Sequence, residues 1–237
     1  TRTSLTNRGI SVIIGRGILA NAFKKQIDIG FSEIIFASGV SNSLETKLCE
    51  FERESQLLTT YLDHDLPLVY FSTCSLYDIQ TDLTPYREHK LKLERLVLSH
   101  PDNYVFRLPQ VVGKGGNPLT LTNYLCQKIL SEEHFLVQEN AFRNLIDVDD
   151  CVKICLKIMS DASFPPSIYS VKNTYDIAII DLVAIIEKVL KINANYSMTS
   201  ETSNFSHKSI VSDLTAERLS IDFANHYTKK LIEKYYG

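Results

Sequence analysis

The residues best suited to chemistry lie between positions 73 and 90. Tyr86 and Lys90 are four residues apart, so on a helix they share one face. A neighbouring ammonium favours the ionised phenol and lowers its pKa, which lets tyrosine exchange a proton with a substrate oxygen near neutral pH. Thr73 follows an apolar run, and a hydroxyl at the carboxyl end of a strand lies where open α/β sheets bind ligands. These three residues predict proton transfer at a substrate oxygen.

A glycine-containing turn precedes this segment in the chain. Gly15, Gly17 and Ala20 fit the pattern G-x-G-x-x-A between a predicted strand and a predicted helix. The first glycine permits a tight turn, the second lets the backbone approach a pyrophosphate, and the small third residue lets helix and strand pack. A purely structural turn is the alternative. Arg16, within the turn, either neutralises a 2′-phosphate, which favours NADP over NAD, or is a solvated loop residue.

Apolar β-rich runs alternate with helical patterns through the first half of the chain. Near-continuous apolar strands in such an alternation predict a parallel sheet with helices on both faces, a Rossmann-like, doubly wound α/β fold. Ser43 is the predicted N-cap of the second helix, and Thr84 that of the third, with Pro85 at its first position. The predicted strands are residues 11–14, 33–37, 67–72 and 104–108, and the predicted helices are residues 18–25, 44–61 and 85–98.

The link between the first helix and the second run is unusually short. About eight residues separate them, too few for a further strand, helix and strand. The acidic residue expected about 20 positions after a dinucleotide-binding turn is also missing. The sheet should therefore lack the β2–β3 edge of a complete dinucleotide-binding fold, and with it the usual adenosine wall.

The pattern changes after Gly113. Residues 1–113 are predicted to form the dinucleotide-binding core. Residues 114–237 should return to the sheet and form a small substrate-side lobe. The predicted elements of this second part are helices at 119–130, 149–159, 180–190, 214–219 and 223–235, a strand at 168–171 and an irregular segment at 193–208.

Composition excludes several classes of protein. The chain has 237 residues, 44 % hydrophobic and 22 % charged, which indicates a globular protein. A net charge of −3 provides no basic field for nucleic acid, and no apolar run is long enough to cross a membrane. The five cysteines match no disulfide or metal spacing, which suits a cytoplasmic protein. Cys151 and Cys155 are read as core residues, and Asp149 and Asp150 as part of a helix start.

Several segments, taken in order, resemble the extended short-chain dehydrogenase/reductases, the family of NAD-dependent epimerases and dehydratases that act on nucleotide sugars. The resemblance covers residues 10–185 and is more specific than any one motif. After the glycine turn, the segments that carry it are EIIFASGVSNS, VYFSTCSLYD, PYREHKLKLERLV, FRLPQVVGKGG and RNLIDVDDCVK.

The resemblance implies roles for individual residues. Tyr86 would be the general acid/base, with Lys90 as its partner and ligand of the nicotinamide ribose. Thr73 would bind the reacting sugar oxygen. Cofactor-binding positions would be Gly15, Arg16, Gly17, Ala20, Ala37, Ser38 and Lys90, and substrate-binding positions would be Thr73, Gln110 and Arg143, the last as a clamp on the nucleotide diphosphate.

Departures from the family's pattern narrow the activity. Cys74 and Ser75 stand where 4,6-dehydratases carry an acidic pair, so dehydration is not expected, and Cys74 is a weak candidate for an epimerase base. His89 replaces the family's small residue before the lysine. The leading prediction is an NAD(P)-dependent reductase of a keto group on a nucleotide-activated deoxysugar in polysaccharide or O-antigen sugar biosynthesis. A 4-epimerase with tightly bound NAD and a non-catalytic NAD(P)-binding relative are the alternatives.

The resemblance also predicts the partners. The substrate would be a nucleotide sugar, with no nucleic acid, membrane or metal involved. The family commonly pairs through two long helices, which here would be residues 44–61 and 85–98. These would form a four-helix bundle across the two-fold axis of a homodimer.

Overall fold

A parallel sheet of five strands lies at the centre of the computed structural model, which describes residues 11–27, 30–78, 82–200, 207–224 and 226–237. Its order is β1-β2-β3-β4-β9, and each neighbouring pair runs parallel. The predicted α/β class with a Rossmann-like sheet is confirmed. The strands are β1 (Val12–Ile14), β2 (Ile34–Phe36), β3 (Leu68–Thr73), β4 (Tyr104–Leu108) and β9 (Ile168–Ser170).

Strand β1 is the edge of this sheet among the described residues. It pairs only with β2, by the register Val12 to Ile34 and Ile14 to Phe36. In a complete dinucleotide-binding sheet further strands follow on the other side of the first strand. The predicted loss of the β2–β3 edge is therefore confirmed. The edge strand is only three residues long, which limits the backbone left open to pairing.

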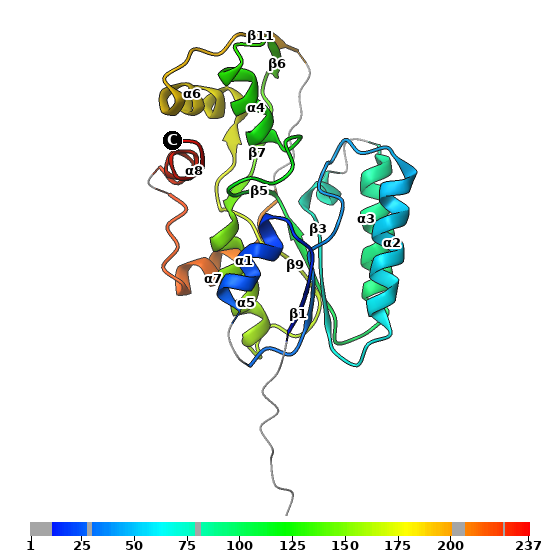
Figure 1. Ribbon diagram of the computed structural model, residues 1–237. Helices are drawn as coiled ribbons and strands as arrows, with labels where there is room; N and C mark the ends of the chain where they lie inside the picture. The colour runs from blue at the N-terminus through cyan, green and yellow to red at the C-terminus, as the bar shows by residue number, and fades with distance from the viewer. Residues whose placement is uncertain (1–10, 28–29, 79–81, 201–206, 225) are drawn as a thin grey trace, which may run out of the picture.

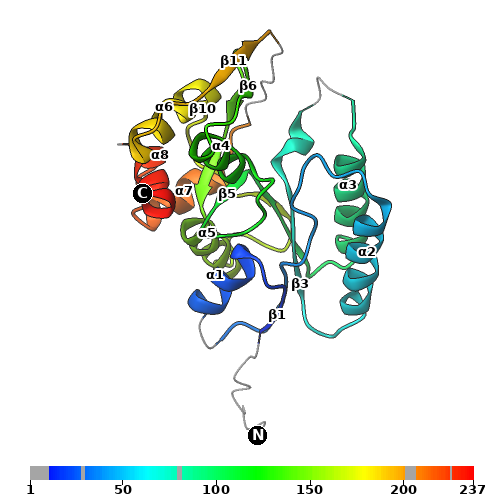
Figure 2. The same cartoon turned by 45° about the horizontal axis from the view of Figure 1, so that its top comes forward.

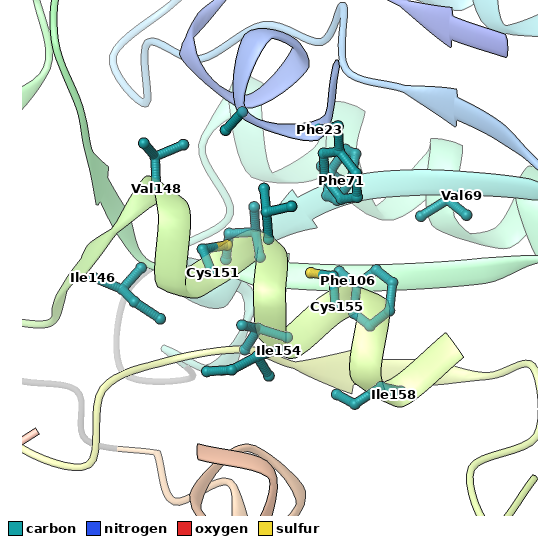
Figure 3. Close-up of a cluster of buried hydrophobic side chains, with 14 of the residues drawn as sticks. Phe23, Val69, Phe71, Phe106, Ile146, Val148, Cys151, Ile154, Cys155 and Ile158 are labelled. Carbon is teal, nitrogen blue, oxygen red and sulfur yellow. The ribbon is translucent and has the colours of Figure 1, made fainter. Parts of the chain in front are cut away.

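Helices cover both faces of the sheet (Figure 1). One face carries α1 (Ile18–Gln26), α5 (Val148–Ser160) and α7 (Ile210–Arg218). The other carries α2 (Leu48–Leu62) and α3 (Pro85–Val97). The first face covers the largest hydrophobic cluster, in which Cys151 and Cys155 of α5 are fully buried near Phe106 and Phe71 (Figure 3). Both thiols are core residues, as predicted.

The rest of the chain forms short strand pairs and further helices beyond one end of the sheet (Figure 2). A second hydrophobic cluster holds these elements together. None of the helices in the described ranges is long and apolar enough to span a bilayer. The strand pairs are β5 (Gln110–Val112) with β8 (Leu145–Asp147), β6 (Phe135–Gln138) with β11 (Tyr196–Thr199), and β7 (Phe142–Arg143) with β10 (Ile177–Ala178); the helices are α4 (Leu121–Leu130), α6 (Ile179–Leu190) and α8 (Tyr227–Tyr236).

Four predicted elements differ from the structure. The helices predicted at 214–219 and 223–235 begin instead at Ile210 and Tyr227. Helix α2 begins at Leu48, with Lys47 as N-cap, so the prediction of Ser43 as cap was wrong. The Asn42 side chain accepts a hydrogen bond from the Leu44 N–H at 3.0 Å and forms a turn there instead. The segment 193–208, predicted to be irregular, contains β11, because pairing with β6 overrides its polar composition; residues 201–206 lie outside the described ranges. The division into parts at residue 113 stays a prediction.

Candidate active site

The glycine turn joins β1 to α1 at the carboxyl end of the sheet. Gly15 has φ of +133°, and a Cβ there would lie 2.2 Å from the Ala37 carbonyl oxygen, so only glycine fits. Such a Cβ would also lie 3.3 Å from the Cβ of Ala20, which explains the small residue. At Gly17 a Cβ would meet nothing within 4 Å, and no side chain caps the N-terminus of α1. The helix N-terminus is thus open to a phosphate group, as a dinucleotide requires.

The other predicted cofactor residues surround this turn. The Ala37 N–H donates to the Ile14 carbonyl at 2.8 Å, and the Ser38 carbonyl accepts from Arg53 Nη1 at 3.1 Å. Arg16 is exposed, and its carbonyl accepts from Asn21 Nδ2 at 3.3 Å. The turn therefore fits a pyrophosphate, while a role of Arg16 toward a 2′-phosphate stays a prediction.

Thr73, Tyr86 and Lys90 lie together where β3 ends and α3 begins. Thr73 is the last residue of β3, and its Oγ accepts from the Ser75 N–H at 3.1 Å. Tyr86 and Lys90 come from the first two turns of α3, which begins as predicted with Thr84 as N-cap. The Lys90 Nζ lies 5.8 Å from the centre of the Tyr86 ring. The structure thus brings the three candidate chemical residues into one cluster.

Burial governs the ionisation of Tyr86, which is 6 % exposed. Burial raises the pKa of its phenol, whereas the charge of Lys90 and a hydrogen bond with Thr73 lower it. Glu54 and Cys74 add smaller increases, and the pKa remains above the ordinary value for tyrosine. Lys90 therefore acts in the predicted direction, but it does not make Tyr86 a tyrosinate at neutral pH.

Glu54 is the residue of this cluster that the sequence prediction missed. Its carboxylate, fully buried on α2, accepts hydrogen bonds from Lys90 Nζ and the Tyr70 hydroxyl at 2.8 Å each. It also accepts from the Val40 N–H at 2.8 Å and is bonded to His89 Nε2 at 3.0 Å. Burial alone would raise the pKa of Glu54, but Lys90 and these hydrogen bonds outweigh it and lower the pKa to about 2.

The sequence pattern of α2 indicates that Glu54 is buried. Phe51, Leu58 and Leu62 lie on the buried stripe of α2, and Glu54 occupies the same stripe at spacing i+3 from Phe51. A carboxylate on a buried stripe requires a cationic or hydrogen-bonding partner inside the protein. Lys90, already singled out on the next helix, is that partner.

Arg143 and Gln110 lie on short strands outside the central sheet, and both are close to Asn144. Arg143, on β7, lines a cavity of about 20 Å³ together with Cys74, Asn144 and Lys172. The backbone N–H of Gln110, on β5, donates to the Asn144 carbonyl at 3.1 Å. Burial lowers the pKa of Arg143, and the charge of Asp78 opposes this. Arg143 and Cys74, the residue that follows β3, thus line the same small cavity.

Two further residues of this region bear on the chemistry. Burial raises the pKa of Cys74 to about 12, and its thiol donates to the Arg107 carbonyl at 3.3 Å, so it is unsuited to act as a base. Lys172, which the sequence prediction missed, is buried and contacts Asp176 Oδ1 at 3.4 Å. Among the residues that the structure describes, no group of three or more histidine, cysteine, aspartate or glutamate side chains could hold a metal ion.

Comparison with known proteins identifies the family of the chain. Residues 19–171 match the model of the NAD dependent epimerase/dehydratase family. The chain belongs to this family. The match includes the Thr73, Tyr86 and Lys90 cluster and ends just after β9. No curated protein matches the sequence significantly.

Solved structures of proteins with bound NAD or NADPH share the fold. MoeE5 in complex with UDP-glucose and NAD is 16 % identical with a TM-score of 0.70, covering 95 % of this chain and 89 % of that chain. UDP-glucuronic acid 4-epimerase from Bacillus cereus in complex with NAD is 15 % identical with a TM-score of 0.66, covering 92 % and 75 %. RMD from Pseudomonas aeruginosa complexed with NADPH is 11 % identical with a TM-score of 0.65, covering 95 % of both chains. At these identities the likeness establishes the Rossmann-type fold.

Proposed function

We propose that this family member is a reductase that uses a nicotinamide dinucleotide, NADPH in preference to NADH, to reduce a keto group of a nucleotide-activated sugar. The observation that carries the proposal is the cluster of Thr73, Tyr86 and Lys90 at the carboxyl end of β3. The open turn at Gly17 lies at the carboxyl end of β1 in the same sheet. The nucleotide-sugar and nicotinamide ligands named for structural neighbours agree with this substrate class.

In the proposed reaction, the amides at the start of α1 and Lys90 would hold a dinucleotide, which would supply the hydride that the carbonyl carbon receives. Thr73 polarises the carbonyl oxygen, and the Tyr86 hydroxyl gives its proton to that oxygen as negative charge develops. The C=O group of the sugar thereby becomes CH–OH, with the hydride on carbon and the Tyr86 proton on oxygen, and the dinucleotide would leave in its oxidised form. Tyr86 then regains a proton from solvent.

The edge position of β1 favours a reductase over a 4-epimerase. An epimerase of this kind must retain its NAD between an oxidation and a reduction of the same substrate. Because β1 has no further strand beside it in the described chain, the wall that would enclose the adenosine half is missing. A cofactor held without this wall exchanges readily, which suits a reductase that uses one NADPH in each turnover.

Residues at the carboxyl end of the sheet would bind the cofactor and the substrate. The amides at the start of α1 would bind the pyrophosphate, with Ala37 and Ser38 lining its path, and Arg16 would pair with a 2′-phosphate. Lys90 would bind the nicotinamide ribose by giving up its weakest contact, the Phe71 carbonyl at 3.5 Å. On the substrate side, Gln110 would contact the sugar and Arg143 the diphosphate.

The test is a titration of the purified protein with NADPH and with NADH, followed by turnover of nucleotide-linked keto sugars. Arg16→Ala should weaken NADPH binding by about tenfold and leave NADH binding unchanged, because only NADPH carries the extra phosphate. Lys25→Ala, at the other end of α1, is the matched control. Tyr86→Phe should bind NADPH normally and lose about 10²-fold or more in turnover.

Either of two results would contradict this proposal. NAD that stays bound through purification, with interconversion of two epimeric sugars, would identify a 4-epimerase. A protein that binds neither NADPH nor NADH would be a non-catalytic relative.

The outer surface of α2 and α3 supports a proposal about the oligomeric state. A groove of about 470 Å³ on the outer side of α2 and α3 includes Leu48, Phe51 and His89. Leu48 is 67 % exposed there, which supports the proposed homodimer through a four-helix bundle. Sedimentation measurements of the molecular mass test it. The cytoplasmic location and the role in polysaccharide biosynthesis stay predictions.

A further inference from the structure

The carboxylate of Glu54 connects four segments beneath the candidate active site. Its partners come from the loop after β2, from β3 and from two successive residues of α3. We propose that Glu54 is a positioning residue, which fixes the Lys90 ammonium and balances its charge so that Tyr86 remains a neutral phenol ready to donate a proton. The inference rests on the proposed function, because it assigns Tyr86 the proton-donating role of the reductive step.

Lys90 is held by protein groups on all its donor positions. Its Nζ donates to Glu54 Oε1 at 2.8 Å, to the Tyr70 hydroxyl at 3.2 Å and to the Phe71 carbonyl at 3.5 Å. An ammonium has three N–H donors, so these contacts account for all of them. The orientation of Lys90 is therefore set before any cofactor binds.

The ion pair is closed off from solvent on the side of the loop after β2. A Cβ on Gly39 would lie 2.8 Å from both Glu54 Oε1 and Lys90 Nζ. The side chains of Lys90 and Glu54 are 3 % and 0 % exposed. In such a dry site each charge acts strongly on its neighbours, so the balance between the two charges decides which form of Tyr86 is stable.

Other charged groups near Tyr86 are themselves balanced or neutral. Glu94 is paired with Arg107 through two hydrogen bonds of 2.9 and 2.6 Å. Burial keeps Tyr70 and Cys74 neutral by raising the pKa of each. The titratable or charged groups facing the cluster are Glu54 of α2, Tyr70 of β3, Cys74 after β3, His89, Lys90 and Glu94 of α3, and Arg107 of β4.

Removal of the Glu54 charge should therefore change the ionisation of Tyr86. In Glu54→Gln the amide keeps the size of the side chain, but Lys90 loses its counter-charge. The Lys90 ammonium, which already lowers the pKa of Tyr86, then acts without the opposing charge of Glu54, so this pKa should fall by about 1 unit. In the double variant Glu54→Gln/Lys90→Met both charges are gone, so the pKa of Tyr86 should return to within about one unit of its value in the wild-type protein.

The experiment follows the ionisation of Tyr86 by NMR in protein labelled with ¹³C at the tyrosine Cζ. The Tyr86 signal is identified by its loss in Tyr86→Phe. Wild type, Glu54→Gln and the double variant are titrated with base, and Glu52→Gln, an exposed carboxylate on the same helix, is the matched control. The remaining tyrosine signals report whether each variant is folded.

The expected result is an early ionisation of Tyr86 in Glu54→Gln alone. A folded Glu54→Gln protein with the wild-type titration would overturn the inference. If Glu54→Gln does not fold, the double variant decides: a shift of Tyr86 by more than about one unit from wild type contradicts the charge balance, and a smaller shift supports it.

This readout is independent of turnover. Absence of NADPH binding combined with a shifted Tyr86 titration would overturn the proposed function and leave the positioning role of Glu54 intact. Normal NADPH turnover combined with an unshifted titration would do the reverse.

Discussion

Two lysines of this protein each pair with carboxylates at 2.8 Å, yet their surroundings differ completely. Lys90 and Glu54 lie between α2 and α3, with side chains 3 % and 0 % exposed. Lys234 of α8 contacts Asp147 Oδ2 and Asp149 Oδ2, and its side chain is 45 % exposed. The two ion pairs thus have the same distance between nitrogen and oxygen but differ greatly in burial. Burial, rather than distance, decides what the loss of one partner does.

The region of the exposed Lys234 is built around Asp147, the N-cap of α5, whose own side chain is buried. Its Oδ1 accepts from the Asp149 N–H at 2.8 Å and from the Tyr235 hydroxyl at 3.0 Å. The Tyr227 hydroxyl donates to Asp150 Oδ2 at 3.0 Å, so α8 is fastened to the start of α5 by several hydrogen bonds. This agrees with the interpretation of Asp149 and Asp150 as structural. The network around Lys234 is thus half-exposed, whereas the network around Lys90 and Glu54 is buried.

The largest effect should come from removal of one buried charge. Glu54→Ala leaves Lys90 buried without a counter-charge and should lower the free energy of unfolding by about 3 to 5 kcal/mol in urea denaturation. In Glu54→Ala/Lys90→Met neither charge remains, so most of this loss should be recovered. A loss below about 1 kcal/mol in the single variant would mean that Lys90 reaches solvent and that the two regions are alike.

Low pH should reduce the stability that the buried Glu54 contributes. The pKa of Glu54 is lowered from 4.5 to about 2, so its ionised form stabilises the fold fully above pH 4.5. That stability is lost as the pH falls from 4.5 towards 2. A difference of 4.5 − 2, or about 2.5 units, corresponds to about 3 kcal/mol. Denaturation curves between pH 6 and 2 should show this loss in wild type and not in Glu54→Gln/Lys90→Met, which has no carboxylate to protonate at this position.

The contrast also explains how far the sequence could predict the molecule. Apolar runs predicted the positions of the five strands of the central sheet, and Thr84 with Pro85 located the start of α3. The Tyr86 and Lys90 spacing located two members of the site. These signals are local: they depend on residues close together in the chain.

The sequence could not show which residues of different helices and strands contact one another. Glu54 contacts Lys90, 36 residues away, and only the packing of α2 on α3 brings them together. The strand β11 was missed because its pairing partner, β6, lies about 60 residues earlier and its own composition is polar. The neutral state of Tyr86 depends on burial and on Glu54, and neither can be inferred from the Tyr86 and Lys90 spacing alone.

A smaller effect is expected at Asp147. Asp147→Ala removes the N-cap of α5 and the acceptor of the Tyr235 and Lys234 contacts, and should lower the free energy of unfolding by about 1 to 2 kcal/mol. Asp147→Asn retains an acceptor oxygen for the cap and should recover about half of this. An effect as large as that of Glu54→Ala would show that the exposed region is as interdependent as the buried pair.

The smallest effect should come from Lys234 itself. Lys234→Met keeps most of the apolar stem and removes a half-exposed ammonium. Asp147 keeps its hydrogen bonds with the Asp149 N–H and the Tyr235 hydroxyl, so the free energy of unfolding should change by less than about 1 kcal/mol. The change should shrink further when salt is raised to 1 M, because salt screens exposed pairs far more than buried ones. The change caused by Glu54→Gln should persist at the same salt concentration. Matching salt dependence in both variants would contradict the view that burial is what distinguishes the two lysines.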